Sequence, residues 1–134
     1  MRVKATGLTR LIALTLLSVV VARTASAQFG HPLKGTWSGE WGTNQTHVVL
    51  ELNWDGKQIT GTINPGPNGA AIKVATLDAS TWAVHLEADG KDRSGAAVHY
   101  VVDGKLDNLG AYRRFITGTW TEGSAKGAFK IVRN

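Results

Sequence analysis

The feature that most constrains the fold of this 134-residue chain is a series of eight short segments in which apolar and polar residues alternate. Clusters of Gly, Asn, Asp and Pro separate the segments, and these residues favour turns. No long stretch has the 3.6-residue apolar period of a helix. The sequence therefore predicts eight antiparallel strands in sequential order, at about 34–42, 46–54, 57–64, 70–76, 81–89, 96–106, 111–122 and 125–133.

Four turns predict how neighbouring strands pair. Asp55-Gly56 favours a two-residue type I′ hairpin, Asn44-Gln45 and Gly123-Ser124 give two further short connections, and Asn108-Leu109-Gly110 fits a three-residue turn. A one-residue slip would turn every side chain to the other face, so it is informative that all four turns select the same apolar face. The predicted pairs are Trp41 with Val48, Trp54 with Lys57, Leu106 with Tyr112, and Trp120 with Gly127.

Eight antiparallel strands that share one apolar face predict an all-β, up-and-down meander. We expect this meander to close into a small barrel, because closure removes both exposed edges of the sheet. A two-sheet sandwich or a half-open barrel is the alternative. Glycines such as Gly39 and Gly118 lie on the predicted inner face, where they either permit strand coiling or open a cavity. The predicted inner face consists of Trp37, Trp41, Val48, Leu50, Leu52, Trp54, Ile59, Ile63, Ile72, Val74, Trp82, Val84, Leu86, Val98, Tyr100, Val102, Ile116, Trp120, Phe129 and Ile131.

Residues 1–27 read as a cleavable signal peptide. A basic start is followed by a 12-residue apolar run at 11–22 and by the small-x-small site Ala25-Ser26-Ala27, which places the new N-terminus at Gln28. A membrane span needs about 20 apolar residues, so we expect no integral span in the mature form. The expected organisation is a signal peptide at 1–27, a lead-in at 28–33 and a single barrel domain at 34–134, located in the periplasm or secreted.

The charge of the mature part is close to neutral. Of the 15 Lys and Arg residues, four lie within residues 1–27, which leaves 11 against all 10 acidic residues and a formal net charge of +1. A nucleic-acid partner is therefore not expected, because it requires a basic face. The absence of cysteine excludes disulfides and thiolate metal sites.

The opening of the barrel domain resembles a known group of proteins. Lys34-Gly35-Thr36-Trp37 is similar to the Gly-x-Trp signature at the first strand of lipocalins, fatty-acid-binding proteins and avidins, and Ile59-Thr60-Gly61-Thr62-Ile63 is similar to the Thr-Gly-Thr strand of avidins. Thr117-Gly118-Thr119-Trp120 repeats the opening pattern near the other end of the chain. The resemblance implies a calycin-like barrel. It also implies that a basic residue of the last strands packs on the first Trp, for which Arg113, Arg114 and Arg133 are the candidates.

Motifs for catalysis or metal binding are absent from the sequence. There is no Gly-x-Ser-x-Gly elbow, phosphate-binding Gly loop or His-Glu-x-x-His pattern. His47, His85 and His99 share the predicted outer face, and His85 and His99 would be close if they were opposite one another on adjacent strands. A solvated polar face is favoured over a zinc or copper site, so we predict no metal site, no cofactor and no catalytic residue.

The aromatic density of the inner face favours a non-enzymatic binder of a small apolar or aromatic ligand within the barrel. One alternative is an interaction or envelope-associated domain, or a weak homodimer, that uses apolar spots on the outer face at Val49, Ala75, Leu77, Ala83 and Val101. A second alternative is a cofactor-free isomerase or cyclase with the barrel cavity as its active site. The candidate ligand-binding residues are Trp37, Trp41, Trp54, Trp82, Tyr100, Tyr112, Arg114 and Trp120.

Overall fold

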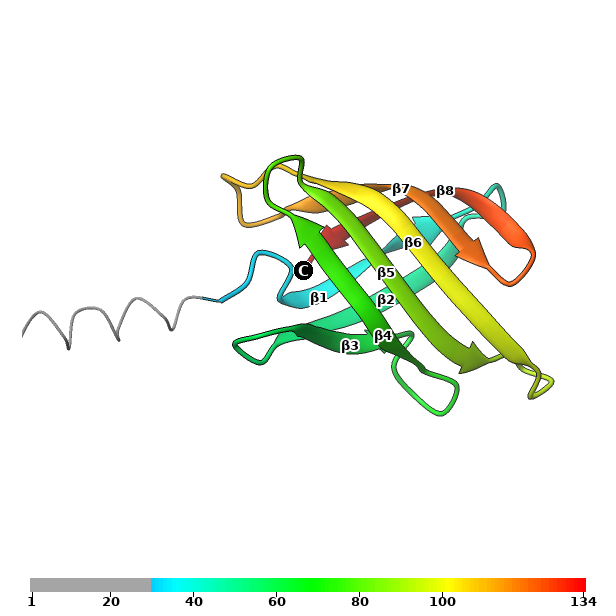
Figure 1. Cartoon of the computed structure of the whole chain (residues 1–134). Helices are drawn as coiled ribbons and strands as arrows, with labels where there is room; N and C mark the ends of the chain where they lie inside the picture. Colours follow the sequence, from blue (N-terminus) through cyan, green and yellow to red (C-terminus); the bar gives the residue numbers. More distant parts are fainter. Residues whose placement is uncertain (1–29) are drawn as a thin grey trace, which may run out of the picture. The chain divides into compact units, whose positions relative to one another are not determined.

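A closed barrel of eight antiparallel strands in sequential order forms the protein (Figure 1), in a computed structural model that describes residues 30–134. This confirms the predicted fold class. The predicted signal peptide and the first two residues of the lead-in lie outside the described residues. The strands are β1 (Gly35–Trp41), β2 (Thr46–Trp54), β3 (Ile59–Ile63), β4 (Ala70–Asp78), β5 (Ala83–Lys91), β6 (Ala97–Asp107), β7 (Phe115–Glu122) and β8 (Ala125–Arg133).

The alternation of strand direction gives the barrel two different ends (Figure 1). The connections β1–β2, β3–β4, β5–β6 and β7–β8 gather at one end, called the loop end below. The connections β2–β3, β4–β5 and β6–β7 gather at the other, where residues 31–34 lead into β1. Leu33 of this lead-in is fully buried, so the second end is called the capped end. Residues 30–134 contain no helix long and apolar enough to cross a bilayer.

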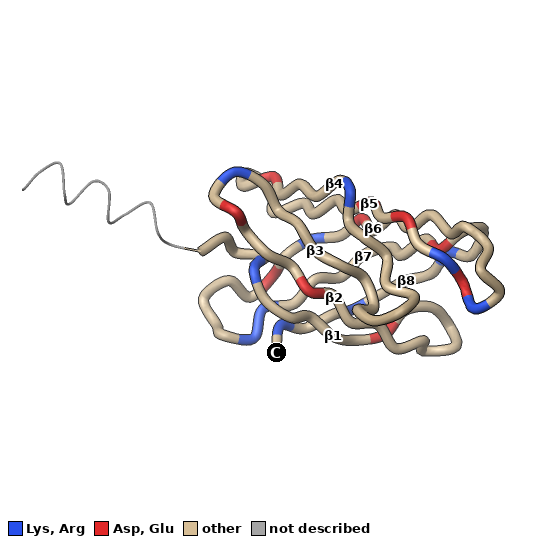
Figure 2. Tube along the Cα trace, turned by 90° about the horizontal axis from the view of Figure 1, so that it is seen from below, with Lys and Arg blue, Asp and Glu red and all other residues tan. Residues whose placement is uncertain are grey.

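The barrel interior is apolar. Among residues 30–134 no polar or charged residue is buried, and Figure 2 shows charged residues spread along the strands and loops without one dominant patch. The buried core consists of Leu33, Trp37, Trp41, Val48, Leu50, Leu52, Ile63, Ala70, Val84, Leu86, Ala88, Tyr100, Val102, Leu106, Ile116, Trp120, Phe129 and Ile131.

The predicted strand pairing is confirmed at β7–β8, where Trp120 pairs with Gly127. The β2–β3 pairing is shifted by two residues, since Trp54 pairs with Ile59. The cause is the carboxylate of Asp55, which accepts hydrogen bonds from the backbone N–H groups of Lys57 and Gln58 at 2.8 and 2.7 Å and so stabilises a four-residue connection.

Two other connections are also longer than predicted. Trp41 pairs with Thr46, a shift of two residues, and Leu106 pairs with Ile116, a shift of four. All three shifts are even, and side chains alternate with a period of two. Most of the predicted inner face is therefore correct even though the predicted turn lengths are wrong.

A β-bulge corrects the predicted inner face in β4. The register against β5 shifts between Ile72 and Val74, which makes Lys73 the extra residue. Beyond the bulge Val74 is 38% exposed, whereas Ala75 and Leu77 pack against the core. The predicted inward Val74 and the predicted outward Ala75 and Leu77 are therefore wrong: the apolar outer face loses Ala75 and Leu77 and gains Val74.

The inner-face glycines mark close approaches of neighbouring strands. A Cβ atom built on Gly39 would lie 1.9 Å from the carbonyl oxygen of Lys130, and one on Gly118 would lie 2.0 Å from that of Asp103. Both contacts are to backbone, which cannot move aside as a flexible side chain can. Of the two explanations offered by the sequence, strand coiling therefore accounts for these glycines.

Gly39→Ala is expected to destabilise the barrel by about 1–3 kcal/mol or more, because the added methyl group meets the β8 backbone. Gly110→Ala is the matched control: nothing lies within 4 Å of a Cβ at this position, so its effect should stay within about 0.5 kcal/mol. Urea unfolding of both variants checks the comparison. Equal stabilities would mean that β1 and β8 are farther apart than described.

Candidate functional site

An aromatic cluster occupies the half of the interior nearest the loop end. The rings of Trp41 and Trp120 are stacked, with centroids 6.2 Å apart and an angle of 24° between their planes. Tyr100 and Phe129 each present an edge to Trp120, at centroid distances of 6.3 and 5.8 Å. These four residues, called the aromatic cluster below, come from β1, β6, β7 and β8. Such contacts favour tight packing in defined orientations.

Two indole groups of the cluster are buried without a partner. Trp120 is fully buried and Trp41 is 8% exposed, yet no protein atom accepts a hydrogen bond from the Nε1–H of either residue. A buried donor without an acceptor costs about 1–3 kcal/mol. Trp37 provides the contrast, since its Nε1–H donates to the carbonyl oxygen of Leu33 at 2.8 Å.

An open depression of about 540 Å³ lies at the loop end above the aromatic cluster. Its lining includes the apolar side chains of Val98 and Tyr100 and the charged residues Glu122, Lys91 and Arg93. Desolvation by burial, together with the nearby Glu122 carboxylate, raises the pKa of Tyr100 to about 12. The phenol therefore stays neutral at physiological pH, and Tyr100 separates the depression from Trp120.

The capped end is held closed by the lead-in. The Arg114 Nη1 group donates to the carbonyl oxygen of Pro32 at 2.9 Å, and the rings of His31 and Trp54 lie 4.7 Å apart. Burial of His31 in this contact lowers its pKa. Arg114 thus anchors the lead-in. A direct stacking of Arg114 on the first Trp, as in lipocalins, is not what the described contacts show.

The predicted site residues therefore divide between the two ends. Trp41, Tyr100 and Trp120 meet at the loop end. Tyr112, a candidate ligand-binding residue within the barrel, is 74% exposed and in contact with the guanidinium of Arg133, so its predicted place in the barrel is wrong. The residues that lie toward the capped end are Trp37, Trp54, Trp82, Tyr112 and Arg114.

The candidate residues named from the sequence include neither Phe129 and Glu122 at the loop end nor Leu33 at the capped end. Phe129 was predicted on the inner face, and it pairs with Gly118, two residues before Trp120 on β7. Glu122 ends β7 and gave no signal beyond being acidic. Leu33 lies before the first strand, where no alternation applies, so its burial under the barrel could not be inferred.

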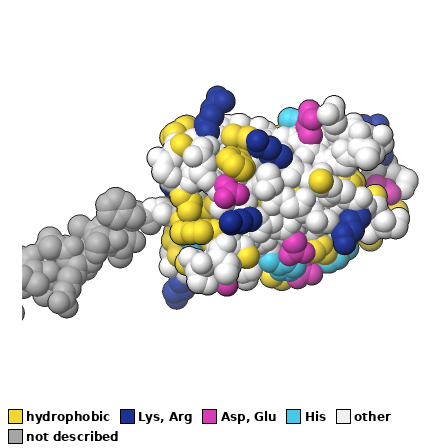
Figure 3. All heavy atoms as spheres, turned by 90° about the horizontal axis from the view of Figure 1, so that it is seen from above, with side chains coloured by type: hydrophobic (Ala, Val, Ile, Leu, Met, Phe, Trp, Pro, Cys, Tyr) yellow, Lys and Arg dark blue, Asp and Glu magenta, His cyan; other side chains and the backbone are white. Residues whose placement is uncertain are grey.

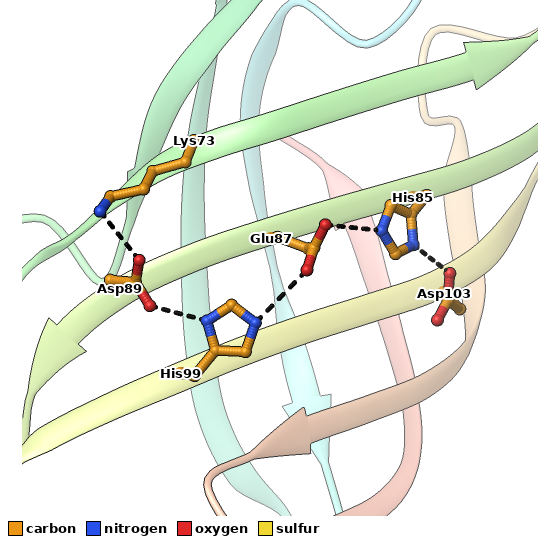
Figure 4. Close-up of polar contacts among 6 residues, drawn as sticks. All are labelled: Lys73, His85, Glu87, Asp89, His99 and Asp103. Atoms are coloured by element: carbon orange, nitrogen blue, oxygen red, sulfur yellow. Dashed lines mark hydrogen bonds and ion pairs between the residues drawn. The ribbon is translucent and has the colours of Figure 1, made fainter.

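A second polar arrangement crosses the outer wall over β4, β5 and β6 (Figure 4). Lys73 Nζ lies 2.9 Å from Asp89 Oδ2, and the other oxygen of Asp89 lies 2.7 Å from His99 Nδ1. The second ring nitrogen of His99 lies 3.4 Å from Glu87 Oε1. The β4 bulge positions Lys73 for this contact.

The arrangement continues through His85. Its Nε2 lies 3.2 Å from Glu87 Oε2, and its Nδ1 lies 2.5 Å from Asp103 Oδ1. The six residues form an alternating series of cations and carboxylates, called the outer ladder below. Figure 3 shows histidine and acidic side chains side by side on the exposed surface. The ladder is therefore solvated, and its ion pairs are individually weak.

Each histidine of the ladder has a carboxylate at both ring nitrogens, and only the imidazolium form donates from both. Hydrogen bonding to Asp103, then to Glu87, raises the pKa of His85. Hydrogen bonding to Asp89 raises the pKa of His99. The two histidines face these aspartates across the β5–β6 pair and do not lie opposite one another.

Within residues 30–134, no three His, Asp or Glu side chains are grouped so that they could hold a metal ion. The ladder is an ion-pair network that links three strands on the outside of the barrel, away from the aromatic cluster.

No protein-family model, curated protein or solved structure matches this chain. The barrel architecture implied by the resemblance to calycins is present, while membership of that group has no support from these comparisons.

Asp103→Asn is expected to lower the pKa of His85 and to leave that of His99 unchanged, because Asp103 contacts only the first ring. NMR titration of the ring Cε1–H resonances measures both. Since folding raises both histidine pKa values above 6.5, the stability from the ladder is complete below that pH and is lost as pH rises through the folded values. An unchanged His85 titration would contradict the contact.

Proposed function

We propose that this protein binds a small apolar or aromatic molecule at the loop end of the barrel, within the aromatic cluster. The observation that carries the proposal is the buried, unpartnered pair of indole N–H groups on Trp41 and Trp120. Buried donors in folded proteins nearly always have a partner, and exceptions concentrate at functional sites. A ligand seated against the cluster supplies the missing contacts.

The architecture supports entry from one end only. The capped end is filled by Leu33 and tied to the barrel by the Arg114–Pro32 hydrogen bond. The loop end carries the open depression, whose lining is mostly polar and includes Val98 and Tyr100 as its apolar members. Tyr100 belongs to both the depression and the aromatic cluster, so the apolar surface that a ligand would need lies behind this side chain.

Tyr100 is the group that must move to admit a ligand. It forms part of the depression and its ring edge contacts Trp120. Neither Trp41 nor Trp120 lines the depression, so a ligand reaches the indole pair only if the Tyr100 side chain is displaced. Binding is therefore expected to require a rearrangement of Tyr100, with the strands of the barrel unchanged.

The placement of the polar candidates favours binding over catalysis. Tyr100 lies at the loop end, whereas Tyr112 and Arg114 lie in the β6–β7 connection at the capped end. They cannot act together on one substrate in the interior.

The proposal is tested by titrating 2-acetylnaphthalene, a flat neutral aromatic compound, into ¹⁵N-labelled protein. Saturable shifts are expected for the indole N–H signals of Trp41 and Trp120, and none for those of Trp54 and Trp82. Trp41→Ala should weaken binding about tenfold or more, because it removes half of the stacked pair. Trp54→Ala at the capped end is the matched control and should bind normally.

Retention of a dispersed amide spectrum shows that each variant is folded. Absence of saturable binding to the unaltered protein, or an equal loss in the Trp41 and Trp54 variants, contradicts a site at the loop end.

Export of the chain is proposed as well, on the basis of the sequence of residues 1–27. When the full chain is produced in a secreting bacterium, the mature protein is expected to begin at Gln28, as measured by intact mass. Replacing Ala25 and Ala27 by Leu should block this processing, because the cleavage site needs small residues. An exported product that keeps residues 1–27 would contradict the signal-peptide interpretation.

A further inference from the structure

The interior near the loop end holds two buried hydrogen-bond donors that have no protein acceptor, the indole N–H groups of Trp41 and Trp120. An indole nitrogen carries a proton and has no lone pair available, so both groups can only donate. The Glu122 carboxylate near Tyr100 contributes to the raised pKa of that phenol. The third buried polar atom without a partner in residues 30–134, Arg114 Nε, lies at the capped end. The two indoles of the aromatic cluster can therefore be satisfied only by a group that accepts.

We infer that the ligand is a flat, neutral carbonyl compound, such as an aromatic ketone, aldehyde, ester or quinone, whose oxygen accepts from the indole N–H groups of Trp41 and Trp120. This inference rests on the proposed binding function and specifies the ligand class. A carbonyl oxygen has two lone pairs, so it can accept from one indole or from both. The apolar remainder of the molecule packs against Tyr100 and Phe129.

A ligand that carries its own donor fits this site poorly. An N–H or O–H group that faces the indole pair meets two further donors in place of an acceptor, and such a group loses its hydration without compensation. The pair therefore favours a ligand that presents an acceptor to it and leaves no buried group unpaired.

A carboxylate ligand is also disfavoured, although it is a good acceptor. Burial of an ionised group requires a paired charge, and none of the cations among residues 30–134 is buried. Lys91 and Arg93 line the depression outside the cluster, while Glu122 lies beside Tyr100 at the entrance. An anion would reach the indole pair only by giving up its contact with these surface cations.

The test compares two compounds of nearly the same shape on the unaltered protein. 2-Acetylnaphthalene carries a carbonyl oxygen, and in 2-isopropenylnaphthalene a CH₂ group replaces that oxygen. The ketone is expected to bind about tenfold more tightly, since it satisfies a buried donor that the alkene leaves unpaired. The Nε1–H resonance of Trp41 or Trp120 should move downfield with the ketone only. The carboxylate 2-naphthoate should bind more weakly than the ketone.

Donor-deletion variants give a second measurement. Trp41→Phe and Trp120→Phe keep an aromatic ring but remove the N–H, so the preference for the ketone over the alkene should shrink toward one in the variant whose indole donates. Trp54→Phe is the matched control and should keep the full preference. Because the two-compound comparison uses the unaltered chain, it stands even if a variant fails to fold.

The outcomes separate the inference from the function on which it rests. Equal affinities for ketone and alkene, with no indole shift, overturn the carbonyl inference and leave loop-end binding intact. Tighter binding of 2-naphthoate than of the ketone overturns the requirement for a neutral ligand. Failure of both naphthalenes to bind overturns the proposed function and the inference together.

Discussion

The dry interior of the barrel is the constraint on which the rest of the structure depends. With no charged residue buried in the described part of the chain, every Lys, Arg, Asp and Glu lies on the outer wall or at the ends. Histidines are subject to the same division, so the outer ladder forms on the solvent side of β4, β5 and β6. Near the loop end, the polar groups buried in the interior are the indole N–H groups of Trp41 and Trp120. These N–H groups make the interior near the loop end a donor of hydrogen bonds.

The two ends of the barrel use tryptophan in opposite ways. At the capped end the indole N–H of Trp37 is satisfied by the lead-in carbonyl of Leu33, and the contact fixes the chain before β1. At the loop end the indoles of Trp41 and Trp120 stack on one another, and their N–H groups have no protein acceptor. The same residue type thus closes one end and leaves hydrogen-bonding capacity at the other. This asymmetry distinguishes a structural contact from a candidate binding contact.

Much of the fold could be predicted from the sequence, because strand alternation and turn residues are local signals. The order of the strands and most of the inner face were correct even where the connections after Trp41 and Trp54 were mispredicted, since an even shift preserves the face. The bulge at Lys73 was not predictable, because Ile72 and Val74 fit an uninterrupted strand equally well. The candidate site was only half predictable. Alternation shows which side of the wall a residue faces, whereas its height along the barrel depends on connection lengths.

The pairing of β1 with β8 also determines the order in which the molecule can be completed. Trp41 lies opposite Phe129, and Trp37 lies opposite Arg133. The hydrogen bonds on this side of β1 therefore cannot form until β8 is present. Contacts of such long sequence separation are slow to form because most of the chain must be ordered first. During synthesis, a chain that still lacks β8 can therefore form at most a seven-stranded sheet with two open edges. The barrel becomes a closed molecule without free edges only when its final residues can pair with β1, and its edges are open to other strands until then.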